Sequence, residues 1–258
     1  MVRAGALYVE TLIRSDPEPL WRLTQEPHQH QRWDLRFTEI DYLPQPDPAL
    51  RFDPAQPQRF RYAVRLLPGL SVSGVGLCAG ERIRPDGTRT SVLRFASAHP
   101  LSLIRSGSGY WRYVPTADGI RFLTGYDYQP GWGRFGAQAD RLLRPLMGWA
   151  TAWSFDRLRL WLEDGIPPQR SLRRALLEVG VRSAAVAAAW WGLPVPGALL
   201  VAVLVTVIAV LAPPSSRAPS ARRCLRRPPD RRSATPPASS RLLADLPMIQ
   251  QPTLQEQP

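Results

Sequence analysis

Residues 9–34 read VETLIRSDPEPLWRLTQEPHQHQRWD, and this stretch is the most informative part of the sequence about the fold. Over 7–13 one face of an extended chain would carry Leu7, Val9, Thr11 and Ile13, which is the pattern of a half-buried strand. Residues 15–18 then supply helix N-cap candidates, an early proline and an acid in the first turn. We therefore expect one strand followed by two short helical segments, the second over 27–33.

Closely spaced strands are expected after a proline-rich loop at 44–58. Aromatic and β-branched residues alternate with polar ones along several segments, and glycine-containing turns such as Pro-Asp-Gly at 85–87 separate them. Such spacing predicts an antiparallel meander. The expected extended segments are 34–43, 59–66, 71–84, 88–98, 103–114 and 119–129.

The period changes to helical over 134–164. Apolar residues recur there at intervals of three and four until Gly165 and the following Ile-Pro-Pro end the helix. An antiparallel sheet with an apolar concave face can be covered by one such helix, and the space between them becomes either core or pocket. The residues that carry this repeat are Phe135, Ala139, Leu142, Leu146, Trp149 and Trp153.

Two stretches give the chain a resemblance to the START-like superfamily, also called SRPBCC. Residues 9–34 look like the family's opening, and WATAWSFDRLRLWLE at 149–163 looks like its final helix, so that the likeness covers 6–164. The resemblance implies an α+β helix-grip fold, in which a curved antiparallel sheet wraps around a long C-terminal helix. It also implies a cavity for a hydrophobic small molecule or lipid. Because the superfamily includes lipid-transfer domains and polyketide cyclases, carrier and enzyme both stay open.

Aromatic residues on the expected sheet and helix are the candidates for the cavity wall. Tyr and Trp offer flat apolar surface together with a hydrogen-bond donor, although a filled core would use the same residues. The ligand-binding candidates are Phe60, Tyr62, Phe95, Trp111, Tyr113, Phe122, Tyr126, Trp149 and Trp153.

No residue is assigned a catalytic role, and no metal or cofactor is expected. His28 and His30 lie two apart, which on a helix points them to different faces, so they are interpreted as surface or helix-end residues. Glu10 and Asp127 fall on the outward faces of their expected strands, where an acid is an ordinary surface group. A cyclase-like enzyme without a metal remains the alternative to a carrier or sensor.

Composition divides the chain into four regions: the helix-grip domain at 1–165, a basic linker at 166–182, an apolar segment at 183–212 and a disordered tail at 213–258. The net charge is +12, and more than half of that excess lies in the two basic stretches that flank the apolar segment. Segment 183–212 carries no charge, whereas the tail is rich in Arg, Pro and Ser. Cys78 and Cys224 lie far apart and predict neither a disulfide framework nor a zinc site.

The apolar segment predicts a membrane anchor. Residues 193–197 read LPVPG and favour a kink or a turn, so 183–212 is either one tilted span or a shallow hairpin. Basic residues on both flanks favour the hairpin, because a single span would leave one Arg cluster outside. We therefore expect a membrane-associated protein with a cytoplasmic folded domain. Nucleic acid is the weaker interpretation of the Arg-rich tail, a protein-recruiting tail is a third possibility, and partner proteins are unknown.

Overall fold

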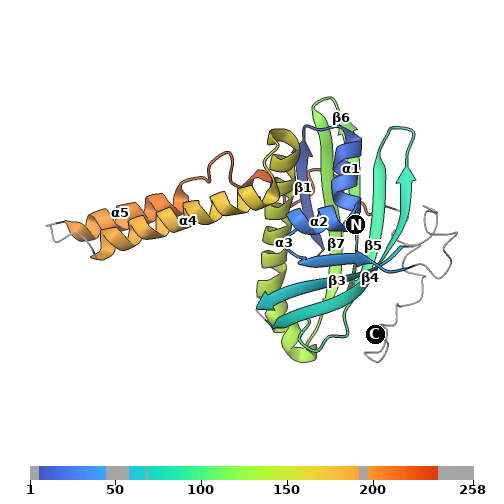
Figure 1. Cartoon of the computed structure of the whole chain (residues 1–258), viewed down its shortest axis with the longest axis horizontal. Coiled ribbons are helices and arrows are strands. Elements are labelled where there is room, and N and C mark those ends of the chain that lie inside the picture. The colour runs from blue at the N-terminus through green and yellow to red at the C-terminus, as the bar shows by residue number, and fades with distance from the viewer. Residues whose placement is uncertain (1–5, 45–57, 68, 192–196, 238–258) are drawn as a thin grey trace.

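A computed structural model of the chain describes residues 6–44, 58–67, 69–191 and 197–237. Figure 1 shows a sheet packed against one long helix, and a pair of helices that projects away from them. The elements are β1 (Leu7–Ile13), α1 (Pro17–Gln25), α2 (Pro27–Trp33), β2 (Glu39–Tyr42), β3 (Gln58–Leu67), β4 (Leu70–Ile83), β5 (Arg89–Ala96), β6 (Ile104–Thr116), β7 (Gly119–Pro130), α3 (Gly133–Asp164), α4 (Pro168–Trp191), α5 (Ala198–Leu211), η2 (Ala221–Arg223) and α6 (Arg231–Ala234).

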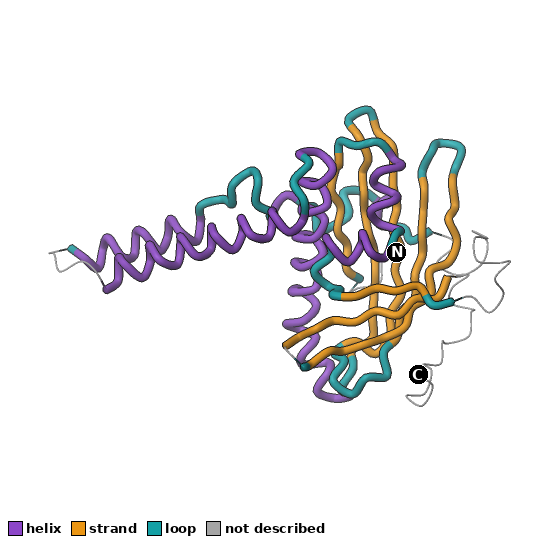
Figure 2. Tube along the Cα trace, in the orientation of Figure 1, coloured by secondary structure: helices purple, strands orange, loops and turns teal. Residues whose placement is uncertain are grey.

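The strands form one 7-stranded antiparallel sheet in the order β1-β7-β6-β5-β4-β3-β2. Strands that follow one another from β2 to β7 are neighbours, and β1 lies at the far edge beside β7 (Figure 2). Consecutive strands can lie side by side because tight turns join them. In the turn between β4 and β5, Asp86 accepts a hydrogen bond from the Thr88 amide at 3.0 Å, and Gly87 has a φ of +76°. The predicted meander is confirmed. Most of the predicted proline-rich loop, 45–57, lies outside the described residues.

The long helix α3 closes the concave side of this sheet. Its Phe155 stacks on Phe122 of β7 with ring centroids 4.5 Å apart, and both side chains are fully buried. Trp33 at the end of α2 joins the same core and donates its indole N–H to the Leu23 carbonyl at 2.8 Å. A curved antiparallel sheet around a C-terminal helix, with two short helices after the first strand, is the START-like helix-grip fold. The predicted fold class is therefore confirmed for this part of the chain.

The two faces of α3 do not match the apolar repeat seen in the sequence. The core side of the helix carries Ala152, Phe155 and Leu158, all fully buried. Leu142 and Trp149, which belong to the repeat, are instead 81% and 43% exposed. Trp149, which was predicted for the cavity wall, does not line the cavity. The residues of α3 that do so are Leu143, Leu146, Met147 and Ala150.

Helices α4 and α5 form an antiparallel hairpin that leaves the body beside α3 (Figure 1). Arg182 of α4 joins them by donating hydrogen bonds to the carbonyls of Ala209, Ala212 and Pro213, at 3.0, 2.7 and 2.9 Å. The guanidinium thereby satisfies carbonyls at the end of α5 that have no partner within the helix. Over the described residues, neither helix is both long and apolar enough to cross a bilayer, so a single membrane span over 183–212 is not supported.

Residues 214–235 return from the hairpin and pack on the body as a strap. Leu225 exchanges two backbone hydrogen bonds of 2.9 Å with Glu10, which covers the free edge of β1. Cys224 is buried in the main core, and its thiol donates to the Ala152 carbonyl at 3.2 Å. Farther along, Arg112 of β6 donates to the carbonyl of Thr235 at 2.7 Å. The prediction of a disordered tail is wrong for 213–237, and 238–258 lie outside the described residues.

The buried carboxylate of Asp156 on α3 holds the strap. Its Oδ2 accepts from the backbone amide of Ser220 at 2.7 Å and from Arg223 at 2.8 Å, while Oδ1 accepts from Arg159 at 2.7 Å. Because the strap supplies part of the core and covers a strand edge, the folded body includes it together with the described residues between 6 and 164. The boundary predicted at Gly165 therefore marks the end of α3 and not the end of the folded body.

Replacing Asp156 tests this clamp. Asp156→Ala leaves the buried Ser220 amide without its acceptor, and we expect the free energy of unfolding to fall by about 1.5–3 kcal/mol. The strap should also become sensitive to trypsin at its arginines. The control is Arg222→Ala, an exposed side chain on the same strap, which should change stability by less than about 0.5 kcal/mol. Urea unfolding measures both, and equal stability of the two variants would contradict the clamp.

Candidate ligand-binding cavity

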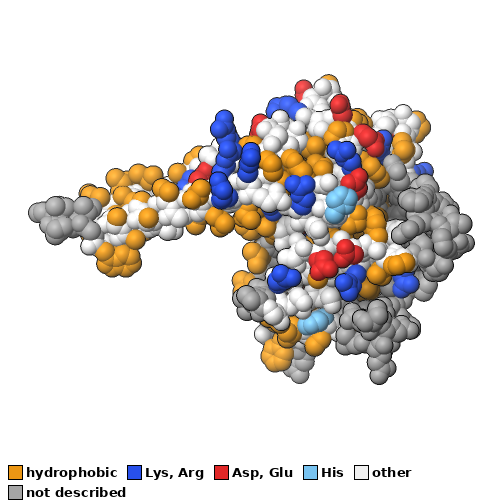
Figure 3. Space-filling view, viewed as in Figure 1, with side chains coloured by type: hydrophobic (Ala, Val, Ile, Leu, Met, Phe, Trp, Pro, Cys, Tyr) orange, Lys and Arg blue, Asp and Glu red, His pale blue; other side chains and the backbone are white. Residues whose placement is uncertain are grey.

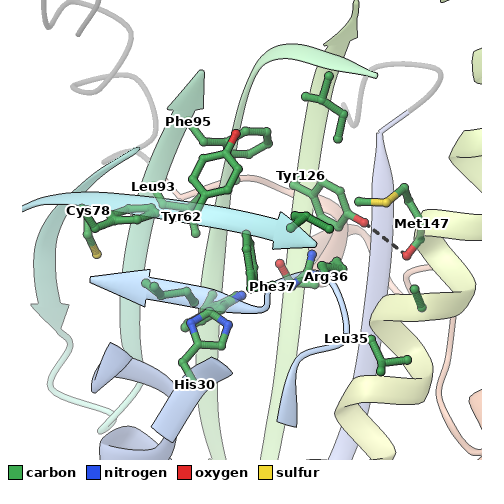
Figure 4. A pocket seen from close by; sticks show the side chains of 18 of the residues that line it. His30, Leu35, Arg36, Phe37, Tyr62, Cys78, Leu93, Phe95, Tyr126 and Met147 are labelled. Atoms are coloured by element: carbon green, nitrogen blue, oxygen red, sulfur yellow. Dashed lines mark hydrogen bonds between the residues drawn. The ribbon is translucent and has the colours of Figure 1, made fainter. Parts of the chain in front are cut away.

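A cavity of about 430 Å³ lies between the concave face of the sheet and the first half of α3. Figure 4 shows side chains from β3, β4, β5 and β7 on one side of it and from α3 on the other. The segment that joins α2 to β2 supplies Leu35, Arg36 and Phe37 at its rim. A volume in this range suits a small-molecule ligand.

Five of the nine aromatic residues named from the sequence line this cavity, and four do not. Tyr113 and Phe122 are buried in the core toward α1, and Trp153 also lies in that core. Trp149 lies on the outer side of α3. The residues that line the cavity are Phe60, Tyr62, Phe95, Trp111 and Tyr126.

Glycines opposite three of these rings explain why the space is hollow. Phe60 pairs with Gly76 across β3 and β4, and Tyr62 pairs with Gly74. A Cβ atom at either glycine would collide with the ring of its partner. The rings therefore lie close against the sheet where a larger neighbour would lift them into the cavity. The sequence shows glycines in these strands but not which rings oppose them.

A charged pair lies beside the apolar wall. Asp34 has a fully buried carboxylate, and Arg36 donates to it through Nε at 2.9 Å and Nη2 at 2.6 Å. Burial opposes ionisation of Asp34, but the charge and hydrogen bonds of Arg36 outweigh it and hold the pKa of Asp34 well below its usual range. Burial likewise opposes the charge on Arg36, and Asp34 more than compensates, so the pKa of Arg36 is raised. Both side chains are therefore ionised, and the pair has no net charge.

His30 completes this cluster. It lies in the last turn of α2, in agreement with the helix-end interpretation, but its side chain is not on the surface. Its Nε2 lies 3.0 Å from Asp34 Oδ2, and its ring stacks on Trp33 with centroids 4.9 Å apart. The ring lines the cavity, with a side chain only 12% exposed. Desolvation lowers the pKa of His30 from 6.5 despite the nearby carboxylate, so the neutral imidazole is favoured at pH 7. Because Asp34 can only accept, the neutral ring donates from Nε2 and keeps a lone pair on Nδ1.

His28 and Glu10, two other polar residues considered from the sequence, do not line the cavity. His28 is exposed, with 68% of its side chain accessible, and lies 3.4 Å from Glu26. Glu10 does not line the cavity, as predicted, but it is not an ordinary surface group, because it is buried under the strap in a 2.7 Å ion pair with Arg121. Within the described ranges, no three His, Cys, Asp or Glu side chains are grouped closely enough to hold a metal ion.

Tyr126 links the charged pair to α3. The guanidinium of Arg36 lies 5.3 Å from the centroid of the Tyr126 ring. The Tyr126 hydroxyl lies 2.9 Å from Thr151 Oγ1 and 3.4 Å from the Met147 carbonyl, the contact marked in Figure 4. Arg36, Tyr126 and the helix thus form one polar patch on an otherwise apolar wall.

A second, uncharged polar group lines the cavity on β4, β5 and α1. Ser91 donates to the Gln25 side-chain oxygen at 3.3 Å and lies 3.5 Å from the Cys78 sulfur. Burial raises the pKa of the Cys78 thiol, which favours the protonated form. Burial also raises the pKa of Tyr62 to about 12, so its hydroxyl stays neutral. The cavity wall therefore carries polar groups but no net charge at neutral pH.

Sequence comparison gives one curated relative of notable similarity. No family model matches the chain. The uncharacterized membrane protein YndG of Bacillus subtilis (strain 168) is 47% identical over 180 residues, which is 69% of this chain and 65% of the relative. The chain thus spans just under two thirds of the length of that relative.

Comparison with solved structures gives similar folds at low identity. The STAR-related lipid transfer protein of Xanthomonas axonopodis (fragment 25–204) is 17% identical with a TM-score of 0.45, over 62% of this chain and 94% of that one. The di-domain ARO/CYC StfQ from the steffimycin biosynthetic pathway is 12% identical with a TM-score of 0.46, over 62% of this chain and 51% of that one. Because both TM-scores are below 0.5, the START-like assignment stands on the topology described above.

Proposed function

We propose that the chain binds a hydrophobic small molecule or lipid in the helix-grip cavity, as a carrier or sensor at a membrane surface. The observation that carries this proposal is a 430 Å³ cavity with aromatic walls and no net charge. Burial of apolar ligand surface against such walls supplies the binding free energy. The polar patch around Arg36 and Tyr126 gives the ligand a fixed orientation.

The charge balance of the wall favours one class of ligand. Arg36 is already paired with Asp34 through two hydrogen bonds, and His30 is neutral, so a ligand carboxylate would find no uncompensated cation. A ketone, ester or hydroxyl needs only a donor or acceptor. We therefore propose an apolar ligand whose polar group is uncharged.

The hairpin supports a location at the membrane. Exposed apolar side chains cover it toward its tip, with Trp190 and Trp191 being 50% and 86% exposed. Exposed Arg170 and Arg173 lie at the start of α4 near its base, where Figure 3 shows basic side chains gathered. A hairpin with an apolar surface, and with arginines where it leaves the body, suits insertion into one leaflet. The arginines would lie at the headgroups, and the folded body would lie on the cytoplasmic side. The name of the Bacillus subtilis relative, a membrane protein, agrees with this proposal.

Filling the cavity tests ligand binding. Ala150→Phe adds a ring to a residue of α3 that lines the cavity, and we expect it to weaken saturable binding of Nile red by about tenfold or more. Ala137→Phe adds the same ring to an exposed position of α3 outside the cavity and serves as the control. Fluorescence titration of both folded proteins gives the comparison. Equal affinity of the two variants, or no saturable binding by the unaltered chain, would remove the carrier proposal.

A charge on the hairpin tests the membrane location. Leu204 is 56% exposed on α5, and Leu204→Glu should weaken binding to phosphatidylcholine and phosphatidylglycerol vesicles by at least about tenfold. Gln169→Glu places the same charge at the exposed start of α4 and should bind nearly as the unaltered chain does. Cosedimentation with vesicles measures both. A chain that stays in the supernatant without any substitution would contradict the location.

A second candidate function is a non-metal enzyme of the cyclase type. The observation in its favour is His30, whose Nε2 is held by Asp34 while the ring lines the cavity. This arrangement fixes the tautomer and leaves Nδ1 as a proton acceptor, which is how a carboxylate orients a general base. Arg36 and Tyr126 nearby could stabilise charge that develops on a substrate oxygen.

The role of His30 as a general base can be tested without knowing the substrate. In 5-nitrobenzisoxazole a base removes the C3 proton, the N–O bond breaks and a coloured phenolate is released. The neutral imidazole is the active form, so the rate should rise as pH increases through the lowered pKa of His30 and be level by pH 7. His30→Gln should lose the acceleration, by about tenfold or more, whereas His28→Gln should keep it. Equal rates for both variants would exclude His30 as a base.

A further inference from the structure

An exposed apolar stripe runs along the first half of α3. Its members are separated by seven, four and three residues, which places them on one side of a helix. Each of these side chains is more than two-fifths exposed in the described structure, although the ring of Trp149 stacks on Trp153 with centroids 6.2 Å apart. The outer stripe consists of Phe135, Leu142, Leu146 and Trp149, which are 76%, 81%, 57% and 43% exposed.

The outer stripe borders the mouth of the cavity. Leu146 belongs to both, because it is more than half exposed and also lines the cavity. Leu35, across the rim, is 38% exposed and lines the cavity as well. Contiguous apolar surface of this kind marks a docking site more often than an idle patch. Whatever covers the stripe therefore lies next to the route by which a ligand enters.

The helix that carries the stripe lies on the side of the body from which the hairpin projects. Figure 1 shows α3 along the edge from which α4 and α5 project, with the sheet on the opposite side of α3 from the hairpin. Figure 3 shows hydrophobic side chains along that edge below the base of the hairpin. A bilayer that receives the hairpin would thus meet the outer stripe with its surface.

The charges around the stripe suit an anionic headgroup layer. Arg141 is exposed on α3, about 100° around the helix from Leu142. The neighbouring acid, Asp140, is compensated by Arg144 at 2.8 Å. Together with Arg170 and Arg173 at the base of the hairpin, these residues leave the membrane side positive.

We propose that the outer stripe docks on the surface of the bilayer that receives the hairpin, so that the cavity mouth opens toward lipid and the ligand enters from the membrane. This inference rests on the proposed function, because it needs both the cavity and the hairpin. It adds a second membrane contact that neither of them requires.

Environment-sensitive labels at three positions test the docking. In a full-length chain with Cys78 and Cys224 replaced by alanine, an NBD label is attached at Leu142→Cys, Ala137→Cys or Val207→Cys. These report the stripe, the other side of α3 and the hairpin. With vesicles of phosphatidylcholine and phosphatidylglycerol, emission at 142 and 207 should shift to the blue and rise by roughly twofold or more, since both labels leave water. Emission at 137 should not change.

The three labels separate the possible failures. A response at 207 without one at 142 would overturn the docking of the stripe and leave the hairpin location standing. No response at either position would remove the membrane location as well. A response at 142 that grows with protein concentration in the absence of vesicles would mean that a second copy covers the stripe, which also overturns the proposal. An equal response at 137 would do the same.

A second measurement needs no cysteine replacement. Leu142→Glu in the otherwise unaltered chain should slow the uptake of Nile red from the same vesicles by about tenfold, while uptake from water stays unchanged. Ala137→Glu is the control with the same charge on the same helix. If the two variants take up Nile red from vesicles at equal rates, the ligand does not enter through the stripe.

Discussion

Aromatic rings that lie against glycines of the neighbouring strand keep the concave face of the sheet hollow, and the rest of the site depends on this. Phe60 over Gly76 and Tyr62 over Gly74 are the clearest cases, and Phe95 over Gly107 repeats the arrangement between β5 and β6. A side chain at any of these glycines would push the ring into the space that a ligand would use. The cavity exists because these rings lie flat on the sheet and do not reach α3.

The charged cluster imposes a second constraint, because Asp34 is buried and must keep its partners. Removing one member of such a pair is costly, whereas the intact pair adds little net charge to its surroundings. Arg36 and His30 hold the carboxylate from two sides, and both also line the cavity. The same contacts that make the cluster stable thus set the polarity of the cavity and the tautomer of the histidine.

Much of the fold could be predicted from residues alone, because turns and alternation are local. The site was harder, because its defining contacts join distant residues. His30 lies four residues before Asp34, a spacing that brings two side chains together on a helix, so this contact could have been predicted. The spacing of the two histidines, on which their interpretation rested, does not show it. Helical periodicity over 134–153 predicted an apolar face but not whether protein covers it. In the structure Trp153 is buried, whereas Phe135, Leu142, Leu146 and Trp149 are exposed.

The strap shows a different limit of composition. An Arg- and Pro-rich segment cannot bury enough apolar surface by itself, which is why disorder was predicted. Here small residues such as Ala221 and Cys224 complete a core supplied by the body, and Arg223 meets the buried carboxylate of Asp156. Such order depends on the partner surface, which composition does not describe.

We propose that the hollow between the sheet and α3 is a binding site for an apolar molecule. Native mass spectrometry of the full-length chain, purified from membranes without an added apolar ligand, tests it most directly. One small apolar molecule should be bound per chain, and organic extraction should release it. Its polar group should be uncharged, unlike the carboxylate of a fatty acid. A bare chain mass from protein that is folded and membrane-bound would contradict it.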